Sequence, residues 1–201
     1  MLSDLFGKVI LASQSPARRK LLEDQGIEVV AKPQDCDEKT SETHPGKVVQ
    51  ALAMLKLQSF LKSADRTLAD DGTPVIASDT LLWSEGRFIG KAHSDDEARE
   101  QISSLQGKTH QVYSGYAVLT KRDGVDEVVS GWDCADVAFK AMDSAWVDSY
   151  VASGEWKGAA GSYHLYGRAV DFVASISGDE ATVIGLPLKA LENRLKHNCI
   201  A

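Results

Sequence analysis

The sequence has no apolar stretch long enough to cross a membrane as a helix. Its longest apolar runs, residues 9–12 and 181–188, fall far short of the roughly 20 residues that such a helix needs. The beginning of the chain also lacks the basic segment, apolar core and small-residue cleavage site of a secretory signal. We therefore expect a cytoplasmic protein that has no membrane partner.

Cysteine is scarce, and its three occurrences, Cys36, Cys134 and Cys199, lie far apart in the chain. An odd number of widely separated cysteines indicates neither a disulfide framework nor a zinc ribbon, so we expect three reduced thiols. Basic residues are outnumbered by acidic ones, which gives a formal net charge of −7. A general nucleic-acid-binding protein usually shows a basic face, so we expect no nucleic-acid partner. Any anion that the protein binds must be held by a local basic cluster.

Several common catalytic motifs are absent from the sequence. There is no Walker loop and no serine nucleophile elbow, and residues 158–161 lack the spacing of the dinucleotide-binding glycine fingerprint. None of the five histidines has a second histidine at the spacing found on the helix of a zinc protease. We therefore interpret each histidine as a surface or structural residue.

What the sequence does contain is an alternation of apolar runs and helical patterns, which indicates an α/β protein. No repeat or linker interrupts the pattern, so we predict one domain over residues 1–201. Turn signals predict hairpins at residues 84–86 and 123–124. The predicted strands are residues 8–12, 27–31, 75–83, 109–120, 125–139 and 169–176. The predicted helices run from Ser15-Pro16 to near Gly26, over 48–63, between Ser94 and Gly107, over 144–152 and over 188–197.

Residues 11–22 predict a strand that leads directly into a helix whose first turn carries hydroxyl groups and arginines. The unpaired N–H groups and positive dipole of a helix N-terminus attract phosphate, and Arg18 can add a bidentate guanidinium. The segment is therefore a candidate anion site. The alternative is a helix capped by Ser15 with basic side chains that point into water, because serine caps and surface arginines are common.

A second candidate is Asp79, which interrupts the apolar strand 75–83 and lies between Ser78 and Thr80. Burying a carboxylate is costly unless a cation or hydrogen bonds compensate, so Asp79 is a candidate metal ligand or general base. The alternative is a structural pair with a nearby lysine or arginine. Lys91 follows the hairpin that begins in this strand and can return to the same end of the sheet, although alone it is an ordinary surface lysine.

These segments together resemble the Maf family, also called septum-formation proteins, whose members hydrolyse nucleoside triphosphates to monophosphates. The resemblance covers almost the whole chain and keeps the order and spacing of the family's motifs. The matching segments are Leu11-Ala12-Ser13, Ser15-Pro16-x-Arg18-Arg19, Asp37-Glu38, Leu52-Ala53, Lys56, Ser78-Asp79-Thr80, Gly90-Lys91, Glu97-Ala98-Arg99, Leu105-x-Gly107, Tyr113-Ser114-Gly115, residues 150–155, residues 160–163 and residues 183–188.

The resemblance implies an α/β fold with a long twisted mixed sheet, flanking helices and two lobes around a cleft, as in Maf proteins and inosine triphosphatases. It implies that Asp79 is the catalytic acidic residue that activates water, and that Glu38 is a second one that shares a divalent cation with it. Mg²⁺ or Mn²⁺ suits carboxylate and triphosphate oxygens. The residues that the resemblance places on the phosphates are Ser13, Arg18, Lys56 and Lys91.

Three positions differ from the better-known branches of the family or distinguish between them. Ala17 stands where one branch has arginine and another a bulky aromatic residue. Thr80 matches the branch that prefers pyrimidine triphosphates, whereas Tyr166 replaces a glutamine or glutamate and can stack on a base or fill the pocket. We expect these residues to govern the choice of base, which the sequence leaves open.

The sequence therefore predicts an enzyme that splits a nucleoside triphosphate into its monophosphate and pyrophosphate, removing non-standard or excess nucleotides. The resemblance also raises the expectation of a homodimer. One alternative is a nucleotide-binding regulatory module, linked to cell-division control, with little catalysis. Another is a phosphatase that releases single phosphates. Product analysis separates the three.

Overall fold

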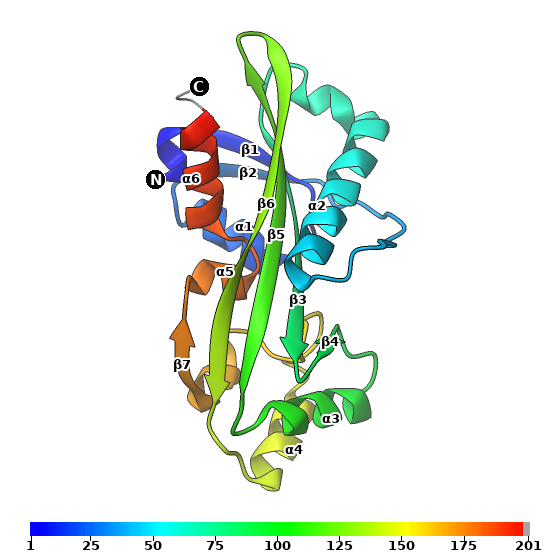
Figure 1. Cartoon of the computed structure of the whole chain (residues 1–201), viewed down its shortest axis with the longest axis vertical. Helices are drawn as coiled ribbons and strands as arrows, with labels where there is room; N and C mark the ends of the chain where they lie inside the picture. Colours follow the sequence, from blue (N-terminus) through cyan, green and yellow to red (C-terminus); the bar gives the residue numbers. More distant parts are fainter. Residues whose placement is uncertain (199–201) are drawn as a thin grey trace. The chain divides into compact units, whose positions relative to one another are not determined.

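The computed structural model describes residues 1–198 and shows an α/β fold built on a mixed sheet, which confirms the predicted fold class (Figure 1). The strands are β1 (Lys8–Leu11), β2 (Glu28–Ala31), β3 (Val75–Ser84), β4 (Arg87–Ile89), β5 (Thr109–Arg122), β6 (Val125–Phe139) and β7 (Val173–Ser177). The helices are α1 (Pro16–Glu23), α2 (Pro45–Lys62), α3 (Asp95–Leu105), α4 (Ser144–Ser153), α5 (Glu180–Ile184) and α6 (Leu188–Asn198). The described residues also include three 3₁₀ helices, η1 (Leu2–Asp4), η2 (Ala64–Ala69) and η3 (Gly167–Phe172).

The sheet is open, and its strands hydrogen-bond in the order β2-β1-β3-β5-β6-β7, with β4 paired to β3. Strand β1 is parallel to both of its neighbours, whereas the β3–β4 and β6–β7 pairs are antiparallel. The described chain divides into two compact units. The first unit comprises residues 1–79, 114–133 and 185–198, and the second comprises residues 80–113 and 134–184. Strands β3, β5 and β6 each contribute residues to both units.

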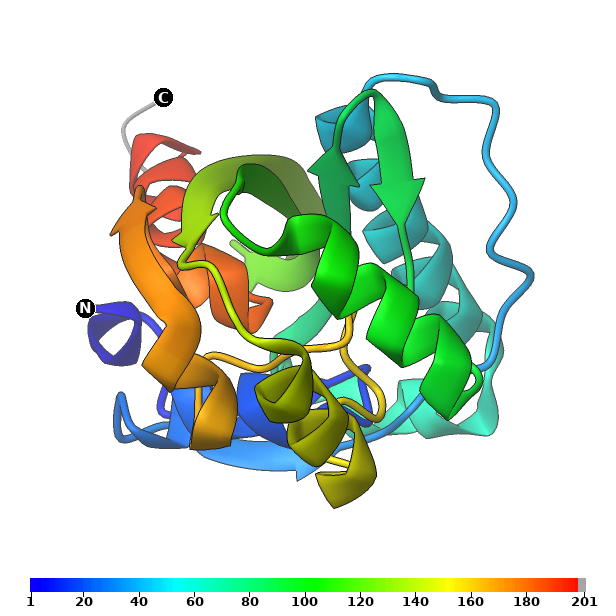
Figure 2. The same cartoon turned by 90° about the horizontal axis from the view of Figure 1, so that it is seen from below.

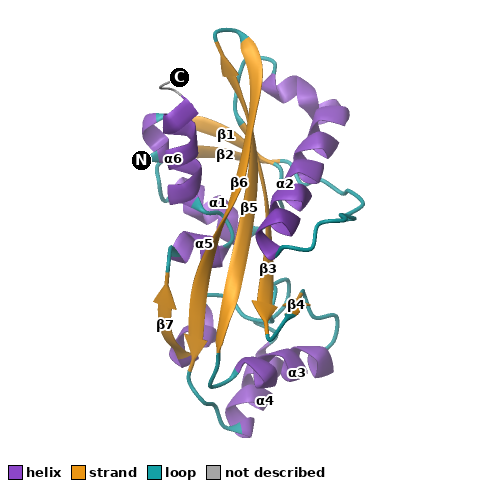
Figure 3. Ribbon diagram, viewed as in Figure 1, coloured by secondary structure: helices purple, strands orange, loops and turns teal. Residues whose placement is uncertain are grey.

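The first unit has three layers, with α2 on one face of the sheet and α1 and α6 on the other (Figure 3). Alternation along each strand produces this arrangement, because successive side chains of a strand point to opposite faces. In β3, Ile76 packs in the cluster that contains leucines of α1 and α6. Its neighbours Val75 and Ala77 pack instead in the cluster that contains Ala53, Leu57 and Phe60 of α2.

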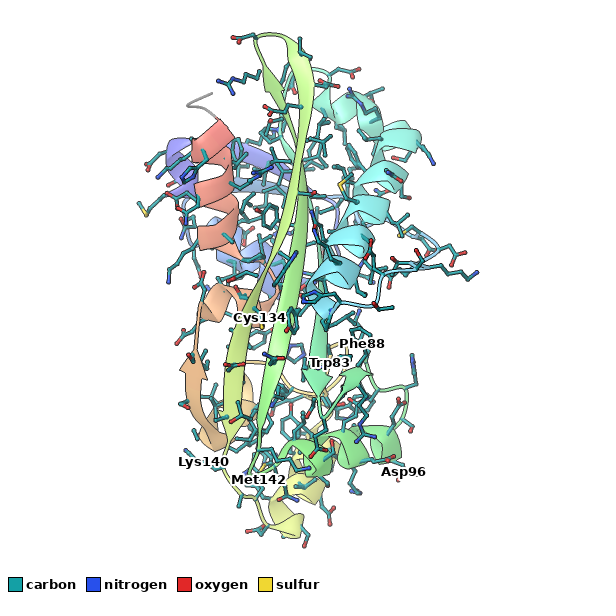
Figure 4. All side chains as sticks on the ribbon, in the orientation of Figure 1. Trp83, Phe88, Asp96, Cys134, Lys140 and Met142 are labelled. Carbon is teal, nitrogen blue, oxygen red and sulfur yellow. The ribbon has the colours of Figure 1, made fainter. Side chains whose placement is uncertain are left out.

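The second unit has a core of its own, in which α3 and α4 lie side by side (Figure 2). Its aromatic side chains meet edge to face, as Phe139 does with Tyr163 and Phe172. At the β3–β4 hairpin, the rings of Trp83 and Phe88 are 4.7 Å apart between centroids and also meet edge to face (Figure 4). Such contacts add to the stabilisation that burial of the rings provides.

The predicted turns and helix ends are present in the structure. Ser15 caps α1 by accepting a hydrogen bond from the Arg18 backbone, and Ser94 caps α3 in the same way. The turn between β5 and β6 has Asp123 and Gly124 at positive φ, 50° and 81°, as a two-residue hairpin turn requires. Gly154 ends α4 in the left-handed conformation. Local chemistry therefore sets these boundaries.

Two elements begin three or more residues away from their predicted positions, and the α-helix α5 was not predicted. The expected strand over 169–176 is wrong in its first half, because residues 167–172 form η3. Ala169 and Phe172 are both buried, which is the three-residue spacing of a 3₁₀ turn rather than the alternation of a strand. Helix α2 begins three residues before the predicted position 48, after an N-cap at His44. The short helix α5 was too brief for a periodic pattern to reveal.

Cys36 and Cys134 are reduced thiols, as predicted, and Cys199 lies outside the described residues. None of the helices within residues 1–198 combines the length and apolar character that crossing a bilayer requires.

Candidate functional site

The β1–α1 connection holds Ser13 and Arg18 against one another. Arg18 Nη1 donates to Ser13 Oγ at 3.1 Å, and the Ser15 backbone N–H donates to the same oxygen at 3.2 Å. Arg18 Nε donates to the backbone carbonyl of Gly185 at 2.8 Å. Two hydrogen bonds, donated by Nε and Nη1, therefore hold the Arg18 guanidinium in place. Because Ser13 Oγ accepts two hydrogen bonds, its own hydroxyl hydrogen can still be donated to a bound group.

A second group of charges lies where α2 faces β3. The Lys56 ammonium forms ion pairs with both Asp79 and Glu38, and its distance to Glu38 Oε1 is 3.0 Å. The side chains of Lys56 and Asp79 are only 13% and 12% exposed, so their pairing compensates the burial of each charge. The Glu38 side chain is 52% exposed and comes from the segment between β2 and α2. Lys56 therefore brings two carboxylates from distant parts of the sequence to one point.

Two glycines allow α2 to approach the sheet closely enough for this contact. A Cβ atom on Gly115 of β5 would lie 2.3 Å from the backbone of Val49 in α2. A Cβ atom on Gly46 would lie 2.3 Å from the ring of Trp132 on β6. Real Cβ atoms do not approach other heavy atoms so closely. Both glycines therefore set the position of α2, and with it the position of Lys56.

The acidic and basic groups influence one another electrostatically. Burial lowers the pKa of Arg18, whereas the nearby carboxylates of Asp79 and Glu38 raise it. The positive and negative groups of the first-unit cluster are thus close enough to interact: Arg18 and Lys56 on one side, Asp79 and Glu38 on the other. Cys36 lies beside the same cluster; burial raises the pKa of its thiol, and the ammonium of Lys56 lowers it. An anion with several charges suits the two cations, and a divalent cation suits the two carboxylates.

The donor set at Asp79 and Glu38 fits a magnesium-type ion that is shared with a substrate. Mg²⁺ is commonly held by one or two carboxylates together with phosphate oxygens and water. Within residues 1–198, the histidine, cysteine and acidic side chains form no group of three that would hold an ion by themselves. Asp79 and Glu38 are two carboxylates, which is a suitable number for an ion that also takes phosphate oxygens and water as ligands. In the structure both of them contact Lys56.

The structure brings together five of the residues that the sequence singles out as catalytic or phosphate-binding, all in the first unit: Ser13, Arg18, Glu38, Lys56 and Asp79. Ala17 lies in the first turn of α1.

The other three predicted residues belong to the second unit. Thr80 follows Asp79 in β3, and exposed Lys91 forms an isolated antiparallel bridge with Ala160. Tyr166 is 48% exposed and its ring stacks on His164 at a centroid distance of 5.1 Å.

Sequence reasoning missed two groups that contact the cluster. The carbonyl oxygen of Gly185 accepts from Arg18 Nε, and Ser78 Oγ lies 2.7 Å from the same oxygen. A backbone carbonyl cannot be recognised from the sequence, because every residue carries one. Ser78 did have one, since it is a hydroxyl on an otherwise apolar buried strand beside a candidate catalytic residue.

Comparison with known proteins gives a family match over most of the chain. The sequence profile of the family described as Maf-like protein matches residues 8–198. Proteins named dTTP/UTP pyrophosphatase from Bacillus cereus (strain B4264) and from Bacillus thuringiensis subsp. konkukian (strain 97-27) are 34% identical over 190 residues, which cover 94% of this chain and 94% of each relative. A protein of the same name from Bacillus cereus (strain ATCC 10987 / NRS 248) has the same identity, over 89% of its own length. Since both the profile and relatives above 30% identity extend over nearly the whole sequence, this chain belongs to the Maf family.

Proposed function

We propose that this protein hydrolyses nucleoside triphosphates to monophosphates and pyrophosphate, with dTTP and UTP as its substrates. The observation that carries the proposal is the cluster in the first unit, where Lys56 joins Asp79 and Glu38 near Arg18. Such a cluster offers both a base for water and cations for a polyphosphate. The relatives named dTTP/UTP pyrophosphatase support both the reaction and the choice of base.

Asp79 is the proposed general base. Its carboxylate takes a proton from a water molecule as the water oxygen forms a bond to the α-phosphorus. The bond between that phosphorus and the oxygen bridging to the β-phosphorus breaks, and the bonding electrons leave with pyrophosphate. Lys56 holds Asp79 and Glu38 in place through its ion pairs, which orients the base.

Ser13, Arg18 and Lys56 are the proposed contacts of the triphosphate. The hydrogen bonds of Arg18 to Ser13 and Gly185 fix its guanidinium before substrate arrives. A guanidinium held in this way loses little freedom on binding and stabilises negative charge that develops on the leaving phosphates. The hydroxyl hydrogen of Ser13 donates to a phosphate oxygen.

Dependence on a divalent cation is part of the proposal. Asp79 and Glu38 are the residues that would hold Mg²⁺ or Mn²⁺ together with the triphosphate, for which two carboxylates are a suitable donor set. The ion would neutralise phosphate charge and polarise the attacked phosphorus.

The proposed choice of a pyrimidine base rests on Thr80, which matches the branch of the family that prefers pyrimidine triphosphates, and on the names of the relatives. Ala17 and Tyr166 are proposed to modify that choice, and Lys91 to contact the phosphates. We also propose that the protein is a cytoplasmic homodimer. Light scattering of the purified protein tests the dimer.

The regulatory alternative lacks support from the site. A protein that only binds nucleotide needs groups that hold the phosphates and their cation, but it has no need for a buried general base. Asp79 is 8% exposed and requires Lys56 to compensate its charge. Relatives named as pyrophosphatases favour the enzyme as well.

Product analysis tests the proposal. The purified protein is incubated with dTTP, UTP, dCTP, dGTP and methylated nucleotides, each with Mg²⁺, with Mn²⁺ and with a chelator. We expect monophosphate and pyrophosphate from dTTP and UTP, and no turnover with the chelator. Release of diphosphate and phosphate would indicate a phosphatase instead, and binding without products would indicate a regulatory module.

A further inference from the structure

We propose that Ser78 is a positioning residue that holds the Arg18 guanidinium through the backbone carbonyl of Gly185. The inference rests on the proposed function, because it takes Arg18 to bind the triphosphate. Ser78 Oγ lies 2.7 Å from the Gly185 oxygen, and Arg18 Nε donates to that oxygen at 2.8 Å. Arg18 Nη1 donates in turn to Ser13 Oγ. A continuous chain of hydrogen bonds therefore joins β3 to the start of α1.

Strand alternation explains why Ser78 contacts the Gly185 carbonyl while its neighbour Asp79 contacts Lys56. Ile76 packs with α1 and α6, and Ala77 packs with α2. Because side chains alternate between the faces of a strand, Ser78 faces the Arg18 side and Asp79 faces the Lys56 side. Adjacent residues of one strand thus contact different parts of the charged cluster. Ser78 contacts the carbonyl that accepts from Arg18, and Asp79 contacts Lys56.

The chemistry of Ser78 supports a positioning role. The residue is fully buried, and its hydroxyl lies 2.7 Å from the carbonyl oxygens of both Gly115 and Gly185. A serine hydroxyl carries a single hydrogen, so two carbonyls share one donor. Gly185 has φ of +125°, a conformation that residues with a side chain rarely adopt, and its carbonyl oxygen lies within hydrogen-bond distance of both Ser78 and Arg18. Loss of the hydroxyl removes one of the donors that hold this carbonyl.

A double-mutant cycle tests whether Ser78 acts through Arg18. We expect Ser78→Ala to lower kcat/KM for dTTP about tenfold, mainly through KM, because Arg18 binds the phosphates of the ground state as well. In an Arg18→Met background, the same substitution should change kcat/KM by less than about twofold, since the group that it positions is gone. A tenfold loss in both backgrounds would mean that Ser78 has only a general structural role.

A second measurement needs no activity. The Nε–H signal of Arg18 in the nucleotide-free protein is identified by its absence in Arg18→Lys, and its exchange with water is measured by NMR. We expect exchange about fivefold faster in Ser78→Ala, because the acceptor of this hydrogen is no longer held. Unchanged exchange would overturn the proposal. If the wild-type protein showed no turnover, the proposed function would be contradicted. The exchange measurement would still test the role of Ser78, because it uses nucleotide-free protein.

Two further variants complete the test. Ser63→Ala removes a hydroxyl that donates to the Phe60 carbonyl at 2.8 Å, so it is a matched control and should leave both measurements unchanged. Ser78→Cys keeps a weak donor of similar volume, and we expect values between those of wild type and Ser78→Ala. If Ser78→Ala does not fold, kcat/KM and the exchange of the Arg18 Nε–H are measured on Ser78→Cys instead. Wild-type values of both in Ser78→Cys would then overturn the proposal.

Discussion

Lys56 makes it feasible for this protein to bury a carboxylate. Asp79 lies on a strand that begins with the buried apolar residues 75–77, and an unpaired charge there would be strongly destabilising. Lys56 compensates it and contacts Glu38 as well, so one ammonium serves two carboxylates. The structural alternative for Asp79, a pair with a lysine, and its catalytic role are therefore compatible.

Replacement of Asp79 by asparagine should strongly reduce turnover and preserve binding. Asparagine is nearly isosteric but is a very weak base, so we expect kcat to fall about 10³-fold while KM changes by a few-fold. Pyrophosphate release under saturating dTTP measures the effect. Asp71→Asn, at an exposed turn before β3, is the control and should retain wild-type kcat. Near-normal pyrophosphate release by Asp79→Asn would show that another group activates the water.

Replacement of Lys56 by methionine should affect both stability and activity. Methionine keeps the aliphatic stem but leaves Asp79 without its cation, and we expect a loss of about 2–3 kcal/mol and a lower kcat/KM. Calorimetry should show Tm lower by about 4–10 °C. Lys62→Met, at the exposed end of the same helix, should change Tm by no more than about 2 °C. Equal Tm values for the two variants would contradict the assigned role of Lys56.

At the scale of elements, the site depends on how closely α2 packs on β5. The periodicity of α2 predicts a packed helix, and its buried face contains Val49, Ala53, Leu57 and Phe60. The distance of approach is set by Gly115, where the helix backbone occupies the space of a side chain. Since Lys56 lies about two turns beyond Val49 on the same helix, a shift of α2 also moves its ammonium.

Gly115→Ala should therefore reduce stability and activity together. The added methyl group would meet the backbone of Val49, which cannot move without the helix, and we expect a loss of about 3 kcal/mol. Thermal unfolding and kcat/KM measure the two effects. Gly7→Ala is the control, because nothing lies within 4 Å of its added methyl group. Unchanged stability of Gly115→Ala would show that α2 adapts without cost.

At the scale of the whole molecule, acid stability depends on a residue in the core of the second unit. His110 is buried between Phe139 and Tyr163, and its Nε2 lies 2.7 Å from the Tyr163 hydroxyl. Among the described residues, its Nδ1 has no hydrogen-bond partner. Burial lowers the pKa of His110 from 6.5 to about 4. The folded protein therefore resists protonation of a ring that the unfolded chain protonates readily.

The pH dependence follows from this difference. Between pH 6.5 and about 4 the unfolded state binds more protons than the folded state, so stability is full above pH 6.5 and falls as the pH decreases. We expect His110 to account for a loss of about 2 kcal/mol between pH 7 and pH 5. Urea unfolding of wild type and His110→Gln at both pH values measures it, since glutamine does not titrate. Parallel losses in the two proteins would rule out His110 as the cause.

The sequence by itself determined most of the elements and the family. Apolar periodicity, the caps at Ser15 and Ser94 and the turn at Asp123-Gly124 depend on neighbouring residues, and they are found as predicted. The motifs also pointed to the family that the comparisons show, although the roles of individual site residues stay predictions. Local patterns failed where spacing was ambiguous, as at η3.

Only the tertiary structure decided which groups contact one another. Lys56 and Asp79 are 23 residues apart, and Arg18 and Gly185 are 167 residues apart, so helix packing on both faces of the sheet had to bring them together. The Gly185 carbonyl has no signature in the sequence, because every residue carries such a group. Its role depends on a backbone orientation that packing selects, and for this reason the link from Ser78 to Arg18 became visible only in three dimensions.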